Sequence, residues 1–326
     1  MKNTYYYLIL TLLAFLATVF ITKSLIPKLR NIAKQPIYDE GPRWHLKKSG
    51  TPTMGGIGFI IPFCIIIALL SILSLISENS ETGVALLITL LFCLLNGLIG
   101  IADDITKLKR SKNGGLTPKQ KLFFQGLISA GFLFARFAFL GDGTELYFGN
   151  FVIDLKWFYY PLAMIFLLGI INCANLTDGV DGLASSTMFA ISVVTFSLSL
   201  TRSEDALTIS SITIGIVLGF LIFNINPAKI FMGDTGSLFL GAVTASYAFS
   251  LRSLPAFILI CGVYVVEGIS VILQVLVYKI TKKRIFKMAP LHHHLEKCGF
   301  DECKICLWAM LVTFSLSTIA SLLIGG

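Results

Sequence analysis

Continuous apolar runs of about twenty residues recur along nearly the whole chain, and they constrain its fold more than any other feature. Hydrophobic residues make up 55% of the sequence and charged residues only 13%, against about 25% charged residues in an average soluble domain. Only helices and closed barrels cross a bilayer, and runs without polar alternation favour helices. We therefore expect an all-α polytopic membrane protein that forms one integral membrane domain over residues 1–326.

The apolar runs predict ten transmembrane helices. Their expected bounds are Tyr5–Ile26, Met54–Ile76, Gly83–Ile101, Lys119–Leu140, Trp157–Cys173, Ser185–Leu200, Leu207–Phe223, Ser237–Ser250, Pro255–Tyr278 and Cys303–Ile324. The eighth is short for an upright crossing and is expected to borrow flanking residues. Between the fourth and fifth spans, Glu145–Asp154 has Gly149-Asn150 at its centre, which is typical of a small β-hairpin.

The basic residues are distributed unevenly between the two sides of the predicted bundle. Most of the 26 lysine and arginine residues fall in or beside the loops after the first, third, seventh and ninth spans. Basic loops stay on the cytoplasmic side of a membrane, so we expect both termini outside. The net charge of +8 mostly reflects this bias and favours anionic lipid, so no nucleic-acid partner is expected.

Four polar segments lie where apolar runs meet water, all on the predicted cytoplasmic side. They are Asp103-Asp104, Asn175–Gly182, Asn224–Asp234 and His292–His294. Carboxylates, amides and imidazoles gathered at one membrane face indicate an active site rather than a solvated surface.

Asp103 and Asp104 end the third predicted span. A helix C-terminus carries partial negative charge, so two carboxylates there are unfavourable by roughly 0.3–1 kcal/mol each. A metal ion or the lysines at 107, 109, 119 and 121 would compensate them. The alternative is a solvated acidic helix end.

Asp178 and Asp181 lie three residues apart in the second segment and would share one face of a helix. Gly179 and Gly182 leave room beside the backbone. The string superficially resembles a calcium loop, but it lacks the later bidentate glutamate, which excludes an EF-hand. A structural turn is the alternative.

Asp234 and Phe231 stand out in the third segment. A carboxylate suits a hard cation, so Asp234 is a candidate Mg²⁺ ligand. The alternative is that Asp234, with Thr235 or Ser237, caps the following helix. Phe231 offers an aromatic face on which a base can stack.

The three histidines cannot all face one metal from a helix, and phosphate binding or proton transfer near neutral pH suits them. Glu267, inside the ninth span, is expected to point into the bundle or a cavity. Cys303-x-x-Cys306 beside the histidines suggests zinc as an alternative, although Cys306 should already be helical.

The first cytoplasmic loop, 41–56, is rich in glycine and proline, which fix an irregular backbone and permit close approach of a ligand. Lys47 and Lys48 can bind phosphate as point charges. The alternative is a positively charged membrane anchor with a turn.

Six strings together carry a resemblance to a known family. They are GPxxHxxKxGTPTMGG at 41–56, DD at 103–104, TPKQK at 117–121, NLTDGxDGLA at 175–184, FMGDTGSL at 231–238 and PLHHHxE at 290–296. In this order they resemble the phospho-N-acetylmuramoyl-pentapeptide-transferase family, within the polyprenyl-phosphate N-acetylhexosamine-1-phosphate transferase superfamily. The PLHHH form favours this branch over relatives that act on N-acetylglucosamine nucleotides.

The resemblance implies a Mg²⁺-dependent reaction at the inner face of a bacterial plasma membrane, in peptidoglycan synthesis. UDP-N-acetylmuramoyl-pentapeptide would react with undecaprenyl phosphate in the lipid bilayer, giving lipid I and UMP. A homodimer is also implied. The alternative chemistry is a two-step route through a phosphosugar–aspartate intermediate.

The resemblance also implies roles for individual residues. Asp103 would deprotonate or position the lipid phosphate, Asp104 would support the site, and Asp234 would bind the metal. The expected substrate-binding residues are Lys48, Lys107, Lys119, Asn175, Leu176, Asp178, Gly179, Asp181, Asn224, Phe231, His292, His293 and His294.

Two rival classes are a transporter and a zinc-dependent intramembrane hydrolase. A transporter places its polar site near the midplane, often between paired repeats, whereas here the acids cluster at one face and no repeat is detectable. The hydrolase requires convergent zinc ligands.

Overall fold

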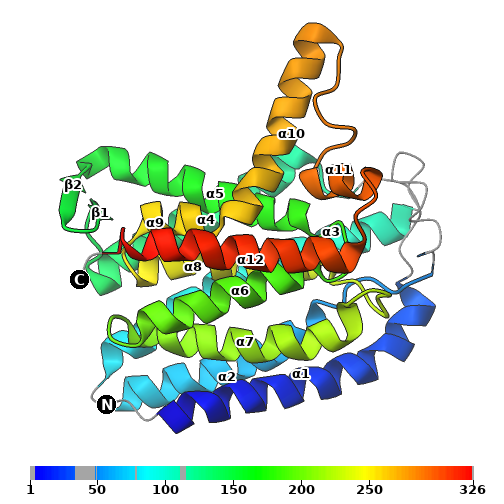
Figure 1. The fold of residues 1–326 in the computed structure, drawn as a ribbon. Helices are drawn as coiled ribbons and strands as arrows, with labels where there is room; N and C mark the ends of the chain where they lie inside the picture. The colour runs from blue at the N-terminus through cyan, green and yellow to red at the C-terminus, as the bar shows by residue number, and fades with distance from the viewer. Residues whose placement is uncertain (1–3, 34–47, 49, 78, 111–114, 325–326) are drawn as a thin grey trace.

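The computed structural model describes residues 4–33, 48, 50–77, 79–110 and 115–324. These residues form a helical bundle with one small sheet (Figure 1). The helices are α1 Thr4–Ile32, α2 Ile57–Ile76, α3 Ser80–Arg110, α4 Pro118–Leu140, α5 Tyr159–Thr177, α6 Leu183–Ser199, α7 Glu204–Asn224, α8 Gly233–Ser250, α9 Leu254–Ile260, α10 Gly262–Thr281, α11 Leu291–Lys297 and α12 Glu302–Ser321, with a short 3₁₀ turn at Lys156–Phe158. The all-α prediction is confirmed.

Eight described helices are long and apolar enough to cross a membrane: α1, α2, α3, α4, α5, α7, α10 and α12. Of the other two predicted spans inside the bundle, α6 has 17 residues and α8 is buried almost continuously from Thr235 to Phe249. A helix that is buried on all sides belongs to the core, and α8 packs mainly against α3 and α5. The protein is thus a multi-pass membrane protein, and the count of ten spans stays a prediction.

The ninth predicted span is wrong as one continuous helix. The structure divides it at Cys261 into α9 and α10. Figure 1 shows α10 leaving the bundle at a steep angle. The buried residues of α10 all lie in its first half, between Gly262 and Ser270.

The predicted hairpin is confirmed. Strand β1, Glu145–Phe148, pairs antiparallel with β2, Phe151–Asp154, and Glu145 lies opposite Asp154. Gly149 in the turn has φ +63°, a conformation that glycine adopts without steric cost.

Both chain ends lie at one end of the bundle, at the left of Figure 1, and the predicted polar segments lie at the other. Along α3, Glu81 and Asp103 are separated by about 33 Å at 1.5 Å per residue. The end with the chain termini has a polar cavity of about 440 Å³, whose lining includes Arg136 and Asp142. Arg136 is paired with Asp142 and also donates to the Phe249 carbonyl at 3.2 Å. That cavity is remote from the acidic groups described next.

Candidate active site

Three carboxylates from two helices converge at the polar end of the bundle. Asp103 and Asp104 come from α3 and Asp234 from the first turn of α8. One oxygen of each lies within 4.8 Å of the others. The expectation that Asp103 and Asp104 terminate a helix is wrong, because α3 continues to Arg110. The unfavourable end of the helix dipole is therefore about two turns away.

Two lysines bridge these carboxylates. Lys107 Nζ lies 2.6 Å from Asp103 Oδ2 and 3.1 Å from Asp234 Oδ2. Lys121 Nζ lies 2.6 Å from Asp234 Oδ2 and 3.3 Å from Asp103 Oδ2. Three acids against two amines leave negative charge in excess, and an all-oxygen set of this kind suits a hard divalent cation.

Asp104 and Asp103 face different partners, as neighbours about 100° apart on a helix should. Asp104 accepts hydrogen bonds from the backbone N–H groups of Asp234 at 3.2 Å and Thr235 at 2.9 Å, and from the Thr235 hydroxyl at 2.7 Å. It therefore caps the N-terminus of α8, whose orphan N–H groups and dipole favour an anion. The alternative that Asp234, Thr235 or Ser237 caps this helix is wrong, because its N-cap residue is Met232 and no side chain of its own caps it.

Asp103 keeps one oxygen directed at the lysines. Its Oδ1 accepts from the Leu116 backbone at 2.7 Å, while Oδ2 faces Lys107 and Lys121. Asp103 is thus the member of the pair whose carboxylate pairs with the two lysines.

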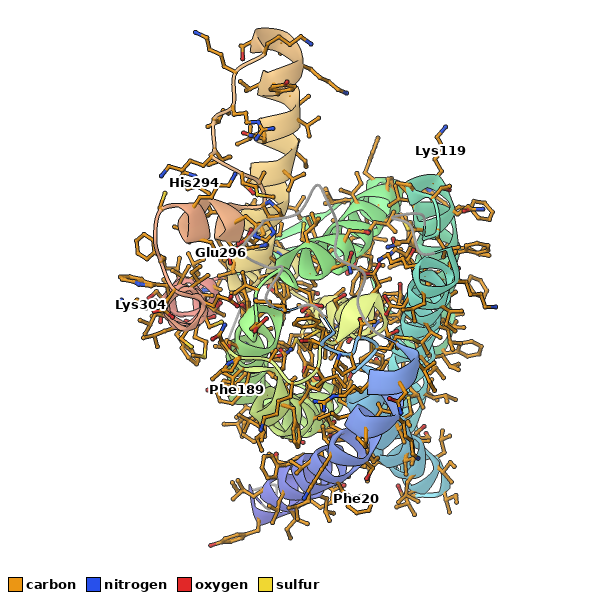
Figure 2. All side chains as sticks on the ribbon, turned by 90° about the vertical axis from the view of Figure 1, so that its right-hand side faces the viewer. Phe20, Lys119, Phe189, His294, Glu296 and Lys304 are labelled. Atoms are coloured by element: carbon orange, nitrogen blue, oxygen red, sulfur yellow. The ribbon has the colours of Figure 1, made fainter. Side chains whose placement is uncertain are left out.

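The TPKQK string forms the N-terminus of α4 and places Lys121 beside the carboxylates. The Thr117 hydroxyl accepts from the Gln120 backbone at 3.3 Å, and the Gln120 side chain accepts from the Thr117 backbone at 3.0 Å, which is a capping box. Lys121 therefore lies on the inner face of the first turn. Lys119 is exposed and points away from the bundle in Figure 2.

The last turn of α5 contacts the acidic group from the side. Asn175 Nδ2 donates to Asp234 Oδ1 at 3.1 Å and to the Ser237 hydroxyl at 2.7 Å. Leu176 is 37% exposed and has no polar role. Burial, reinforced by the negative charges of Asp234 and Asp104, raises the pKa of Asp178 well above its usual range.

The raised pKa of Asp178 predicts how the stability of the protein depends on pH. The folded protein holds the Asp178 proton more tightly than the unfolded chain does, so stability falls as rising pH ionises the group. Asp178→Asn should raise the melting temperature by about 2 °C or more at pH 8.5 and by less at pH 6. Scanning fluorimetry at both pH values measures the effect. The exposed Asp154→Asn should give no such gain, and a gain for Asp178→Asn that is equal at both pH values would contradict the assignment.

Gly55 and Gly56 of the first loop bring its backbone into contact with the backbone at the start of α8. Gly55 N–H donates to the Phe231 carbonyl at 2.8 Å, and Gly56 N–H donates to the Met232 carbonyl at 3.0 Å. A Cβ on Gly56 would lie 2.4 Å from the Gly236 Cα, closer than real Cβ atoms approach. The close approach predicted for a ligand is thus made here by the start of α8.

Lys48 belongs to a second polar cluster. Its Nζ lies 2.7 Å from Asp181 Oδ1 and 2.7 Å from Glu302 Oε2. The other Asp181 oxygen accepts from the Ala228 backbone at 2.9 Å. Burial lowers the pKa of Lys48, but the hydrogen bonds to Asp181 and Glu302 outweigh it and raise that pKa overall.

Asn224 ends α7, and Phe231 lies in the segment between α7 and α8. Asn224 is buried, donates to the Ile230 carbonyl at 3.0 Å and accepts from the Ser185 hydroxyl at 2.9 Å. Its amide is therefore used to hold this segment. Phe231 is half-buried, and its backbone N–H donates to the Pro52 carbonyl at 2.9 Å.

The three histidines of α11 have three different polar partners. His292 is fully buried against Glu267, 3.1 Å from ring Nδ1 to Oε2. His293 Nδ1 lies 2.6 Å from Glu296, and His294 Nδ1 accepts from the Lys287 backbone at 3.1 Å. Figure 2 shows His294 and Glu296 on this short helix, at the face that carries the site. Glu267 points inward as predicted.

The zinc alternative lacks convergent ligands in the part of the chain that the structure describes. Cys303 is exposed, while the buried Cys306 donates its thiol to the Asp181 carbonyl at 3.3 Å. Within the described ranges, Asp103, Asp104 and Asp234 form the one group of three or more residues with metal-ligand spacing.

Comparison with known proteins agrees with this geometry. Residues 85–252 match the family model described as glycosyl transferase family 4. The phospho-N-acetylmuramoyl-pentapeptide-transferase of Caldicellulosiruptor bescii is 39% identical over 313 residues, 95% of either chain. That of Bacillus cytotoxicus is 44% identical over 306 residues, 92% of this chain and 91% of the relative. The chain belongs to the phospho-N-acetylmuramoyl-pentapeptide-transferase family. Membership of this family favours a transferase over the transporter and the zinc-dependent hydrolase.

Two residues that contact the polar groups of the site, Lys121 and Glu302, were not predicted from the sequence as site residues. The sequence predicts Lys121 only as a charge that compensates Asp103 and Asp104, although the capping box fixes its place on α4. Glu302, in the first turn of α12, joins Lys48 and also accepts from the Asp181 backbone at 3.0 Å. No local sequence pattern predicts the role of Glu302, because its partners lie more than one hundred residues away in the chain.

Proposed function

We propose that this chain transfers phospho-N-acetylmuramoyl-pentapeptide from its UDP-linked donor to undecaprenyl phosphate, forming lipid I and UMP in peptidoglycan synthesis. The bacterial plasma membrane holds the enzyme, and the site faces the cytoplasm. The observation that carries the proposal is the Asp103–Asp104–Asp234 group with its two lysines, at the ends of membrane helices. Such a place is accessible to a soluble nucleotide and to a lipid phosphate.

The lysines would bind and align the two phosphorylated substrates. Lys107 and Lys121 can each exchange a carboxylate contact for a phosphate oxygen. We assign to Lys121 the role that the sequence suggested for Lys119. Asp103 would position the acceptor phosphate, which is largely dianionic near neutral pH because its second pKa is about 6. Alignment then matters more than proton removal.

In the direct reaction, an acceptor phosphate oxygen forms a bond to the sugar-linked phosphorus of the donor. The bond from that phosphorus to the bridging oxygen breaks, and UMP leaves with the electron pair. Asp104 holds Asp234 in place through the N-terminus of α8.

The carboxylates fit a divalent cation, since they supply only oxygen ligands within 4.8 Å of one another. Asp234, with Asp103 beside it, would hold Mg²⁺. A bound Mg²⁺ would offset the charge that accumulates on the diphosphate as UMP departs.

The nucleotide would lie beside the segment after α5 and the start of α8. Asn175 and Asp178 would border it. The room that the sequence predicted beside Gly179 is instead filled by the His292 ring. Lys48, Asp181 and Asn224 would shape its pocket through the contacts that hold the neighbouring loops together. The histidines would contact the sugar or diphosphate side.

Phe231 would stack on the uracil ring. Phe231→Ala should weaken UMP binding by roughly 1–3 kcal/mol, about a 5- to 150-fold rise in Kd, because stacking contributes this much per base. Isothermal titration with UMP and Mg²⁺ measures it. Phe231→Tyr keeps the aromatic face and should bind normally, and an unchanged Kd for the alanine variant would exclude stacking.

The deciding experiment is UMP release from purified protein in nanodiscs. We expect release only when UDP-N-acetylmuramoyl-pentapeptide, undecaprenyl phosphate and Mg²⁺ are all present. Release without the lipid would instead indicate a hydrolase. Rapid quench with labelled donor and no lipid should leave the protein unlabelled, whereas a chemically competent adduct on Asp103 would establish the two-step route.

A further inference from the structure

The N-terminal part of α4 has few apolar contacts with the bundle. The buried side chains of this helix are Gln125, Ser129, Phe132, Leu133 and Arg136. No apolar side chain of α4 before Phe132 is therefore buried, and several in this part are exposed: Leu122, Phe123, Phe124 and Leu127. Apolar side chains that face lipid do not hold membrane helices together, because lipid tails are equally apolar. The placement of the first turns of α4 thus depends on polar contacts.

Gln125 makes such a contact with α5. Its Oε1 accepts from Asn172 Nδ2 at 2.9 Å. The same Asn172 amide also donates to the Leu168 carbonyl of its own helix at 2.8 Å, so both of its hydrogens are used. Gln125 is fully buried. The hydrogen bond therefore joins α4 to α5 in one defined orientation.

A second polar link between α4 and α5 lies one turn closer to the acidic group and passes through Asp234. Lys121, four residues before Gln125, places Nζ 2.6 Å from Asp234 Oδ2. Asn175, three residues after Asn172, donates to Asp234 Oδ1 at 3.1 Å. Residues three or four apart share one face of a helix, so the two links lie one above the other. Each oxygen of Asp234 is thus held from a different helix, and both contacts require the right spacing between those helices.

We propose that Gln125 is a positioning residue, whose hydrogen bond to Asn172 sets the spacing of α4 and α5 at which Lys121 and Asn175 both reach Asp234. It acts from one turn below the site, and a displacement of about 1 Å in such a group is enough to lower turnover about 100-fold. This inference rests on the proposed function, because it concerns the same carboxylate. Gln125 lies outside the six strings that carry the family resemblance.

Gln125→Leu should lower kcat for UMP release about 10- to 100-fold. Its melting temperature should change by less than about 3 °C, because one hydrogen bond between membrane helices contributes little to stability. Ser129→Ala is the matched control. Ser129 is buried one turn further along the same face, and its hydroxyl has no hydrogen-bond partner among the described residues, so kcat should stay at the wild-type value. A normal kcat for Gln125→Leu would overturn the proposal.

Exchanging the two amide side chains separates positioning from a general weakening of the fold. Gln125→Asn shortens the reach from α4 by one methylene group, and Asn172→Gln lengthens the reach from α5 by the same amount. Each single variant should lose about tenfold in kcat, and the double variant should recover to within about threefold of the wild type. Such recovery requires direct contact between the two positions. A double variant no faster than the slower single variant would contradict the proposal.

Amide hydrogen exchange gives a readout that does not depend on turnover. In Gln125→Leu without substrate, the α4 backbone from Pro118 to Gln125 should exchange about threefold faster, because the contact that holds these turns is lost. Ser129→Ala and the double variant should exchange at the wild-type rate. Unchanged exchange in Gln125→Leu would exclude the positioning role. Failure of the wild-type protein to release UMP would instead contradict the proposed function, and the exchange rates would still report on the Gln125–Asn172 contact.

Discussion

Asp234→Asn is expected to lower kcat for UMP release about 100- to 1000-fold at saturating Mg²⁺. The substitution keeps the size of the side chain and its contact with Asn175, but it removes the charge that Lys107 and Lys121 share. It would leave the proposed Mg²⁺ with a neutral ligand where charge would build in the transition state. Steady-state kinetics across a Mg²⁺ titration measure the loss.

The exposed Asp154 in the hairpin provides the matched control for Asp234→Asn. Asp154→Asn makes the same chemical change at the far end of the bundle and should leave kcat unchanged. The melting temperature of Asp154→Asn should stay near the wild-type value. Full activity of Asp234→Asn at high Mg²⁺ would remove Asp234 from the metal site.

Lys121→Met is expected to lower kcat/KM about 100-fold, and Lys119→Met to leave it unchanged. The two lysines lie on the same turn of α4, yet only Lys121 reaches Asp103 and Asp234. Methionine preserves the length of the side chain without its charge. Parallel assays of the two variants at several ionic strengths measure the difference.

The comparison of Lys121→Met with Lys119→Met also contains a control for a general effect of charge. Removing an amine from a group with excess negative charge should shift the Mg²⁺ dependence as well as the rate. Equal losses in the two variants would indicate a general effect of basic charge at the membrane surface, and would contradict a specific contact for Lys121.

The choice between Lys119 and Lys121 shows where sequence reasoning stops. The capping box in TPKQK is readable and predicts where α4 begins. Gln125, Ser129 and Arg136 continue one buried face of α4, and Lys121 lies four residues before Gln125 on that face. This periodicity was available in the sequence, although a polar face on an apolar helix gives a weak signal.

Asp104 and Glu302 illustrate contacts that no local pattern reveals. Asp104 caps a helix that begins about 130 residues later in the chain. Glu302 completes a cluster whose other members lie before α2 and after α5. Both roles depend on how α3, α8 and α12 pack, and many sequences with the same apolar pattern are compatible with different packings. The break at Cys261 belongs to the same class, because its flanks are equally apolar.

The sequence by itself determined that this protein is a bundle of membrane helices with acids, amides and imidazoles at one end. Apolar length and polar interruption are local properties, and the bilayer imposes them on each segment separately. Only the tertiary structure decided which carboxylate caps α8, which lysine joins the acids and where the ring of His292 points. Those outcomes depend on distances between residues that are remote in the chain, and these distances follow from side-chain packing between helices.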